Sequence, residues 1–148
     1  MNTRYQFLFS LLVLILLVPR AVNAQVASEW QPVFLQVTGD NHMDGVEASF
    51  QINACNGEDV IYVKFINHNN YPVKVEWFDA VFTQDLTWIN KEQASDKKSL
   101  TIPANKEAKG ECSGNLFPEL YVKVKTFVAE KKNFKRYHAS QLMVIAVK

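Results

Sequence analysis

The side chains of this sequence that could bind a soft metal ion are histidines and methionines. They are widely spaced along the chain: His42, Met43, His68, His138 and Met143. Imidazole and thioether groups both suit copper, so a fold that brought these residues together could form a copper site. No two of the histidines have ligand spacing, and two of them lie in or beside polar turn segments, where a solvated histidine is expected. The sequence therefore predicts no metal site and no cofactor.

A second cation-binding pattern covers residues 40–45, with the sequence Asp-Asn-His-Met-Asp-Gly. Side-chain oxygens at alternate positions and a glycine at the sixth resemble the opening of a calcium loop. The twelfth position, however, is Gln51 where such a loop has glutamate, and the flanking segments have the pattern of strands. Asp, Asn and Gly also tolerate the backbone angles of tight turns, so we expect a turn here.

Catalytic motifs are not found in the sequence. Ser113 lies between Cys112 and Gly114, and no base or orienting acid can be assigned to it. There is no Gly-x-Ser-x-Gly motif and no glycine-rich phosphate loop. The 15 acidic residues are scattered, so paired carboxylates for glycoside chemistry cannot be identified. We predict a protein that is not an enzyme, with no catalytic residue.

Two groups of side chains could form binding surfaces. Phe82 and Trp88 follow Trp77, which fits the buried face of a strand, and they could form an aromatic patch that stacks on sugars or anchors a partner. The second group is a local excess of positive charge that could bind an anionic ligand: Lys123, Lys125, Lys131, Lys132, Lys135 and Arg136. We expect Lys123 and Lys125 on the outward face of one strand. The alternative is that these lysines only protect a sheet edge.

Residues 1–24 have the three parts of a cleavable export signal. Arg4 precedes an apolar run over residues 7–18, and small residues follow at 21–24. The run is shorter than the about 20 residues of a membrane-spanning helix. We predict cleavage after Ala24, a single mature domain over residues 25–148, and a secreted or periplasmic location. No later apolar stretch is long enough to span a bilayer.

The mature chain is almost neutral and has two cysteines. Without Arg4 and Arg20, 14 basic side chains remain against 15 acidic ones, so we expect no nucleic-acid partner. Cys55 and Cys112 would form a disulfide in an oxidising compartment. The alternative, a redox or metal pair of free thiols, lacks a Cys-x-x-Cys spacing.

The period of the apolar residues is two over most of the mature chain, which predicts strands. The candidate segments are 33–37, 46–52, 59–67, 71–78, 80–89, 99–102, 120–128 and 141–147. Segment 59–67 is apolar on most of both faces and should be central in its sheet. We expect segments 120–128 and 141–147 to be close partners through a turn near 131–133. This number of short strands predicts an antiparallel sandwich.

Two segments carry a resemblance to immunoglobulin-like domains of small exported bacterial proteins. They are 67–77, an Asn turn followed by Pro-Val-x-Val-x-Trp, and 101–103, Thr-Ile-Pro, which leads to a Gly-x-Cys. The resemblance implies an all-β, antiparallel immunoglobulin-like β-sandwich of about seven or eight strands. Unlike the cysteines of antibody domains, Cys55 and Cys112 are expected in turns at strand ends. Their bridge should therefore clip loops together and not join the two sheets.

These observations favour an exported binding or interaction module of the cell envelope, whose partner would be a glycan or an envelope protein. Two other classes remain open: a structural subunit of an exported assembly, and a small metal-binding or hydrolytic protein. Metal analysis and glycan binding would separate the first class from the last. Co-purification from the native envelope would test the structural subunit.

Overall fold

The alternating residues 46–67 form one long hairpin. β3 (Val46–Cys55) and β4 (Glu58–Asn67) pair antiparallel along their whole lengths. Asn56 and Gly57 form the two-residue turn between them with φ of 52° and 78°. Asn and Gly tolerate these positive angles, and this kind of turn matches the twist of the strands that it joins.

The computed structural model describes residues 29–35 and 39–148. The predicted export signal and its cleavage site after Ala24 lie outside the described residues. Among the residues that are described, no helix has the length and the apolar character needed to cross a membrane.

The first sheet is built around the β3–β4 hairpin. β4 is central in it, as its two apolar faces predict: β3 lies on one side, and β8 and β9 pair with it on the other. Two more short strands, β1 and β2, pair with β3. The bounds of the added strands are β1 (Gln31–Pro32), β2 (His42–Met43), β8 (Glu107–Lys109) and β9 (Tyr121–Lys123).

The second sheet is built around β5 (Val73–Thr83). β10 (Phe134–Ala146) pairs with one edge of β5, and β6 (Trp88–Asn90) and β7 (Lys98–Ile102) pair with the other. The predicted segments 71–78 and 80–89 are thus one strand followed by a hairpin to β6. The alternation continues through Asp79 without a break, because the side chain of Asp79 points into the core in line with Trp77 and Val81.

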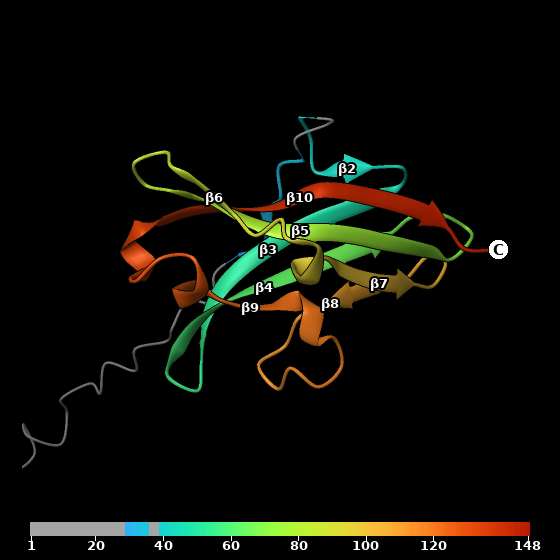
Figure 1. Ribbon diagram of the computed structural model, residues 1–148. Coiled ribbons are helices and arrows are strands. Elements are labelled where there is room, and N and C mark those ends of the chain that lie inside the picture. Colours follow the sequence, from blue (N-terminus) through green and yellow to red (C-terminus); the bar gives the residue numbers. More distant parts are fainter. Residues whose placement is uncertain (1–28, 36–38) are drawn as a thin grey trace, which may run out of the picture.

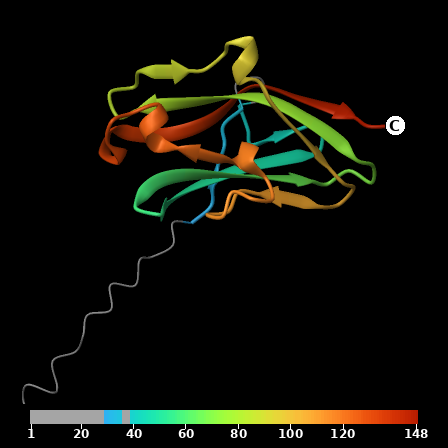
Figure 2. The same cartoon turned by 60° about the horizontal axis from the view of Figure 1, so that its bottom comes forward.

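The two sheets form the layers of an antiparallel β-sandwich, which confirms the predicted fold class (Figures 1 and 2). Its core contains the inward side chains of both sheets, among them the fully buried Trp77, whose ring meets that of Phe65 edge-on at 5.0 Å. The described residues contain ten strands, more than the seven or eight expected, because two- and three-residue strands have no readable period. Four single-turn 3-10 helices connect the strands: η1 (Ala94–Asp96), η2 (Pro118–Leu120), η3 (Val124–Thr126) and η4 (Lys131–Asn133).

The prediction that segments 120–128 and 141–147 are close partners is wrong. β9 pairs with β4 in the first sheet, whereas β10 pairs with β5 in the second. The alternation after Lys123 is interrupted by η3 and η4, which carry the chain from one layer to the other.

The predicted disulfide is present between Cys55 and Cys112, with a Cα–Cα distance of 5.4 Å. Cys55 is the last residue of β3, and Cys112 lies in the connection between β8 and β9. Both connected elements belong to the first sheet. The bridge therefore clips a loop to a strand end and does not join the two sheets. The sequence predicted that the sheets are not joined, but it placed both cysteines in turns, whereas Cys55 belongs to β3.

Candidate functional site

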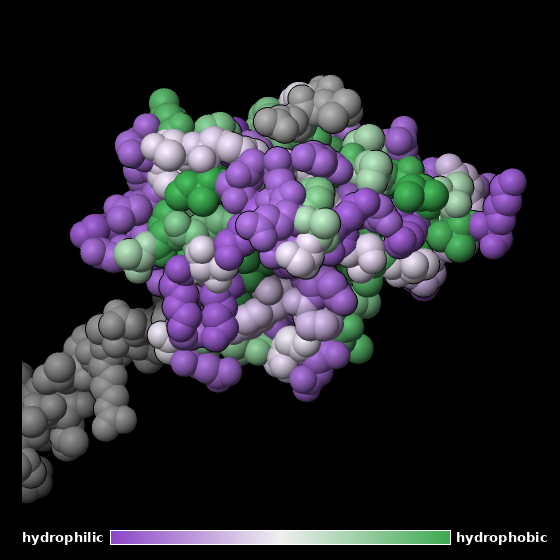
Figure 3. Space-filling model, viewed as in Figure 1, coloured by the Kyte–Doolittle hydropathy of each residue, from purple (hydrophilic) through white to green (hydrophobic). Residues whose placement is uncertain are grey.

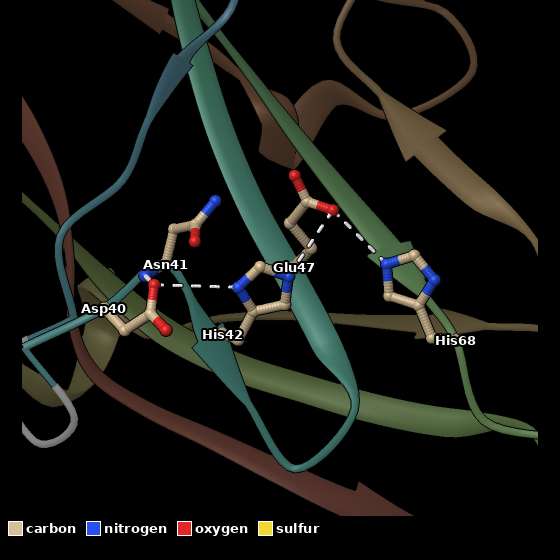
Figure 4. A network of polar contacts seen from close by, with 5 residues as sticks. All are labelled: Asp40, Asn41, His42, Glu47 and His68. Atoms are coloured by element: carbon tan, nitrogen blue, oxygen red, sulfur yellow. Dashed lines mark hydrogen bonds and ion pairs between the residues drawn. The ribbon is translucent and has the colours of Figure 1, made fainter.

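Three potential metal ligands meet on the outward face of the first sheet: His42, Glu47 and His68 (Figure 4). One ligand atom from each lies within 4.8 Å of the other two. The Oε2 atom of Glu47 is 3.6 Å from Nε2 of His42 and 3.3 Å from Nε2 of His68. The two imidazole rings are stacked with their centroids 6.3 Å apart. We call these three residues the His-Glu-His cluster.

A tight hairpin places His42 next to Glu47. Asp44 and Gly45, with φ of 47° and 75°, form the two-residue turn between β2 and β3. In the resulting register His42 is directly opposite Glu47. Side chains that are directly opposite in an antiparallel pair lie on the same face of the sheet, so this turn alone brings together two of the three ligands.

A buried asparagine places His68 beside the hairpin. Asn67 is fully buried, and its Oδ1 atom accepts hydrogen bonds from the backbone and side-chain nitrogens of Asn69, at 2.9 and 3.0 Å. Asn69 donates in turn to Asp44 O, and the backbone nitrogen of His68 donates to Gly45 O at 2.8 Å. The Nδ2 atom of Asn67 is bonded to main-chain oxygens of Tyr71, Ile102 and Pro103. The backbone on both sides of the cluster is therefore fixed before any ion binds.

The donor atoms suit a transition-metal ion. Two imidazole nitrogens and one carboxylate oxygen are the protein ligands of many zinc sites, which leave a fourth position open. Ligands at about 2.1 Å from a tetrahedral ion lie about 3.4 Å apart, close to the separations of 3.6 and 3.3 Å measured from Glu47 Oε2. The ligand nitrogens of His42 and His68 lie within 4.8 Å of each other, and rotation of these exposed rings would adjust their separation to that of a bound ion.

A second carboxylate, that of Asp40, lies next to the ring of His42. Oδ1 of Asp40 is 3.7 Å from Nδ1 of His42, on the side of the ring away from Glu47 (Figure 4). Metal-binding histidines commonly donate their other N–H to a carboxylate, which orients the ring and raises its basicity. The same oxygen of Asp40 accepts a hydrogen bond from the backbone nitrogen of Asn41 at 2.6 Å.

Comparison with known proteins gives a limited result. No known protein family and no curated protein matches the chain. Among solved structures, a member of the DUF1425 family from Shewanella sp. pv-4 is similar, with a TM-score of 0.43 and 12% sequence identity. The similarity covers 70% of this chain and 79% of that one.

The structure separates the other metal-binding candidates of the sequence from the cluster. Met43 faces the opposite side of its strand and packs against the core. His138 and Met143 lie on β10 in the second sheet. Glu47 was missed by sequence reasoning, although an Asp-Gly turn at 44–45 already implies that residues 42 and 47 are opposite each other. Within the calcium-like segment 40–45, Asp44 and Gly45 form a turn, as expected, whereas His42 and Met43 form the strand β2.

The predicted aromatic residues Phe82 and Trp88 are half-buried and pack around His138. The three rings lie about 5 Å apart, with centroid distances of 4.8 and 5.1 Å. Nδ1 of His138 is 2.9 Å from the main-chain oxygen of Phe34. Nδ1 donates a hydrogen bond to this oxygen, because a carbonyl oxygen can only accept. Burial lowers the pKa of His138, which favours the neutral form of the ring. Phe82 and Trp88 thus share much of their ring surface with this histidine and not with solvent.

Four of the predicted basic residues form ion pairs with acidic neighbours, and Lys125 and Lys131 line one shallow pocket together with Glu58 and Asp59. Lys123 ends β9 and Lys125 lies in η3, so they do not share the face of one strand, and both pair with Glu58. These two ammonium groups lower the pKa of Glu58 to about 2. Lys131 pairs with Asp59 at 3.2 Å, and Lys132 pairs with Glu130 at 2.7 Å. Much of the expected positive charge is therefore neutralised locally.

Unlike the other four predicted basic residues, Lys135 and Arg136 form no ion pair with any described residue. The guanidinium of Arg136 lies over the ring of Phe34, 4.7 Å from its centroid. Lys135 is exposed and makes no ion pair with any residue that the structure describes. Figure 3 shows the molecule from the side seen in Figure 1, and hydrophilic side chains cover much of this face.

Proposed function

We propose that this protein is an exported, non-enzymatic binding module of the cell envelope, and that it binds a divalent transition-metal ion. The observation that carries the proposal is the His-Glu-His cluster, in which three ligand atoms lie within 4.8 Å of one another. Their backbones are held by the 44–45 turn and by Asn67, so little ordering would be needed on binding.

The ligand set also restricts the ion. Calcium and magnesium prefer sites made of oxygen atoms, whereas imidazole suits zinc, copper and nickel. For a given site with nitrogen and oxygen ligands, affinity is generally higher for Cu²⁺ than for Zn²⁺. We therefore expect Cu²⁺ to bind most tightly, followed by Zn²⁺, with no measurable competition from Ca²⁺ or Mg²⁺.

Binding fits this site better than catalysis does. The side chains of His42 and His68 are 50% and 52% exposed, and the cluster lies on the open face of a sheet. Electrostatic stabilisation of a transition state is strongest in a site that excludes water. A substrate bound at this cluster would remain solvated.

Export is supported by residues 1–24, which have the pattern of a cleavable signal. The disulfide between Cys55 and Cys112 is compatible with an oxidising compartment. Sequencing the N-terminus of the exported product tests this part of the proposal. The expected first residue is Gln25, and a product that keeps Met1 in a membrane would contradict it.

Titration calorimetry of the mature protein with Cu²⁺ and Zn²⁺ tests the metal site. His42→Ala, Glu47→Gln and His68→Ala should each weaken binding by about tenfold or more, because each removes one of three ligands. Glu107→Gln is the matched control, since Glu107 is an exposed carboxylate of the same sheet outside the cluster. Equal affinities for all four variants and the parent protein would contradict the proposal, provided that their thermal unfolding without metal is the same.

A second candidate function is a structural subunit that accepts a strand from a neighbouring protein. Among the described strands β10 pairs only with β5, so no described strand occupies its other edge, where a further strand could pair. Met143, Ile145 and Val147 are exposed in or just after its C-terminal half. Co-purification from the native envelope, with β10 cross-linked to its neighbour, would support this function over metal binding.

A further inference from the structure

A small hollow opens between the edges of the two sheets, away from the His-Glu-His cluster. Its volume is about 270 Å³. The lining residues come from β1, β3, η4 and the start of β10: Gln31, Phe50, Ile52, Lys131, Phe134 and Lys135. We call it the edge pocket. Pockets for drug-sized ligands have about 300–1,000 Å³, so its ligand would be smaller.

The floor of the edge pocket is apolar and is part of the core. Phe50 and Phe134 are 2% and 7% exposed and are part of the core. Their rings meet edge-on with centroids 6.1 Å apart. Ile52 is partly buried and packs against the same core. Because Phe50 and Phe134 are almost fully buried, most of the apolar surface that a ligand could remove from water here belongs to Ile52.

The rim of the edge pocket is positively charged. Lys131 and Lys135 are both exposed lining residues. The Nζ atom of Lys131 is 3.2 Å from Oδ1 of Asp59, whereas Lys135 makes no ion pair among the described residues. The rim therefore offers one uncompensated ammonium group and one that is shared with a carboxylate.

We propose that the edge pocket binds a medium-chain alkyl carboxylate. The alkyl chain lies on Ile52 and on the exposed edges of Phe50 and Phe134, and the carboxylate pairs with Lys135, assisted by Lys131. A single negative charge matches the one uncompensated cation on the rim.

This assignment is independent of the metal site. Phe50 and Ile52 are on the inward face of β3, whereas Glu47 is on the outward face, because side chains alternate along a strand. Lys131 and Lys135 belong to the basic group that the sequence singled out, but only these two line the edge pocket. Failure of either proposal would leave the other unaffected.

The test uses octanoate, below its micelle concentration, with mature protein labelled at isoleucine methyl groups. The Ile52 methyl signals should shift on titration and yield a dissociation constant. Lys135→Gln should weaken octanoate binding by about five- to tenfold, since it removes a charge-assisted hydrogen bond. Lys131→Gln should have a smaller effect. Lys132→Gln is the matched control, because Lys132 pairs with Glu130 and does not line the edge pocket.

Two other ligands separate the parts of the proposal. Octanol has the chain without the charge and acetate has the charge without the chain, so both should bind at least about tenfold more weakly than octanoate. The proposal is overturned if octanol or acetate binds as well as octanoate. It is also overturned if Lys132→Gln weakens binding as much as Lys135→Gln, or if octanoate leaves the Ile52 signals unchanged.

Discussion

The hydroxyl group of Tyr137 donates a hydrogen bond of 2.7 Å to the carboxylate of Asp79 between the two sheets. Tyr137 is fully buried, and burial together with Asp79 raises its pKa well above the usual value. Nε1 of Trp77 donates to the same Oδ1 atom at 3.2 Å. The other oxygen of Asp79 pairs with Nζ of Lys98 at 2.7 Å, and that ammonium also donates to the main-chain oxygen of Glu119. A buried carboxylate with this many partners is satisfied on both oxygens.

The Asp79 network should matter more for stability than its single hydrogen bonds suggest. Tyr137→Phe should lower the free energy of unfolding by about 1–2 kcal/mol, since Asp79 keeps Trp77 and Lys98. Asp79→Ala should cost about 3–5 kcal/mol, because it leaves Lys98 and the Tyr137 hydroxyl without their partner. Urea unfolding measures both, with the exposed Glu107→Ala as a control. Equal losses for the two core variants would show that the carboxylate is not the centre of the network.

Gly45 should be needed for both the hairpin and the metal site. Its φ is +75°, and a Cβ atom there would lie 2.5 Å from Oδ1 of Asn69. Gly45→Ala should therefore strain the backbone and also displace the side chain that holds the loop next to His68. We expect a loss of stability of about 1–3 kcal/mol and weaker binding of Cu²⁺ in calorimetry.

Gly57→Ala is the matched control for Gly45→Ala. Gly57 has a φ of +78°, but nothing lies within 4 Å of the position of its Cβ atom. This variant should lose only about 1–2 kcal/mol of unfolding free energy, from the strain of a left-handed backbone at alanine. It should bind Cu²⁺ like the parent protein. If both variants lose the same stability and both keep their affinity for Cu²⁺, the contact with Asn69 does not position the site.

Acid should destabilise the fold through two carboxylates. Hydrogen bonds from Lys123 and Lys125 lower the pKa of Glu58 from 4.5 to about 2, and those from Lys74 and Lys97 do the same for Glu76. A carboxylate whose pKa is lower in the folded state stabilises the fold fully above its unfolded pKa. That contribution is lost as the pH falls from about 4.5 to about 2.

Unfolding in urea between pH 6 and pH 2 measures this loss. In the double variant Glu58→Gln and Glu76→Gln, stability should fall less steeply over the window from about 4.5 to about 2. Above that window the two proteins should have parallel profiles. An identical pH dependence throughout would mean that neither carboxylate is held in its ionised form by the lysines.

The disulfide should supply much of the stability of the domain. The closed loop has a sequence separation of 57 residues, for which the chain-entropy model gives roughly 4 kcal/mol. The double variant Cys55→Ala and Cys112→Ala should lose about this much in urea unfolding. Parent protein treated with a reductant should match the double variant. A loss below about 1 kcal/mol would indicate that the unfolded chain is already restricted without the bridge.

Strands with a clear period were predictable from sequence, and contacts between distant segments were not. β3 and β4 follow from alternation and from Asn56-Gly57. The misplaced pairing of 120–128 with 141–147 arose because nothing local shows that η3 and η4 divert the chain to the other sheet. Asp79 in the inward row of β5 could not be interpreted without Lys98 and Tyr137, whose positions depend on the fold.

The candidate site was predictable only in part, for the same reason. His42 and Glu47 are neighbours because of a local turn, so their proximity can be deduced from residues 42–47. His68 joins them through Asn67, whose side chain is bonded to the main chain 35 residues away at Ile102. No local pattern contains that contact.

The disulfide has a mechanical consequence. Residues 55–112 form a covalent ring that contains β4 and β8 from the first sheet and β5, β6 and β7 from the second. If the molecule is pulled by its two ends, the force passes through the sulfur atoms, and the chain within the ring bears no load. The ring has a sequence separation of 57 residues. At about 3.4 Å per extended residue, the bridge therefore withholds roughly 190 Å of chain from extension. Stretched between two anchoring points, the oxidised protein would extend only in the segments before Cys55 and after Cys112. The reduced protein would extend along its whole chain.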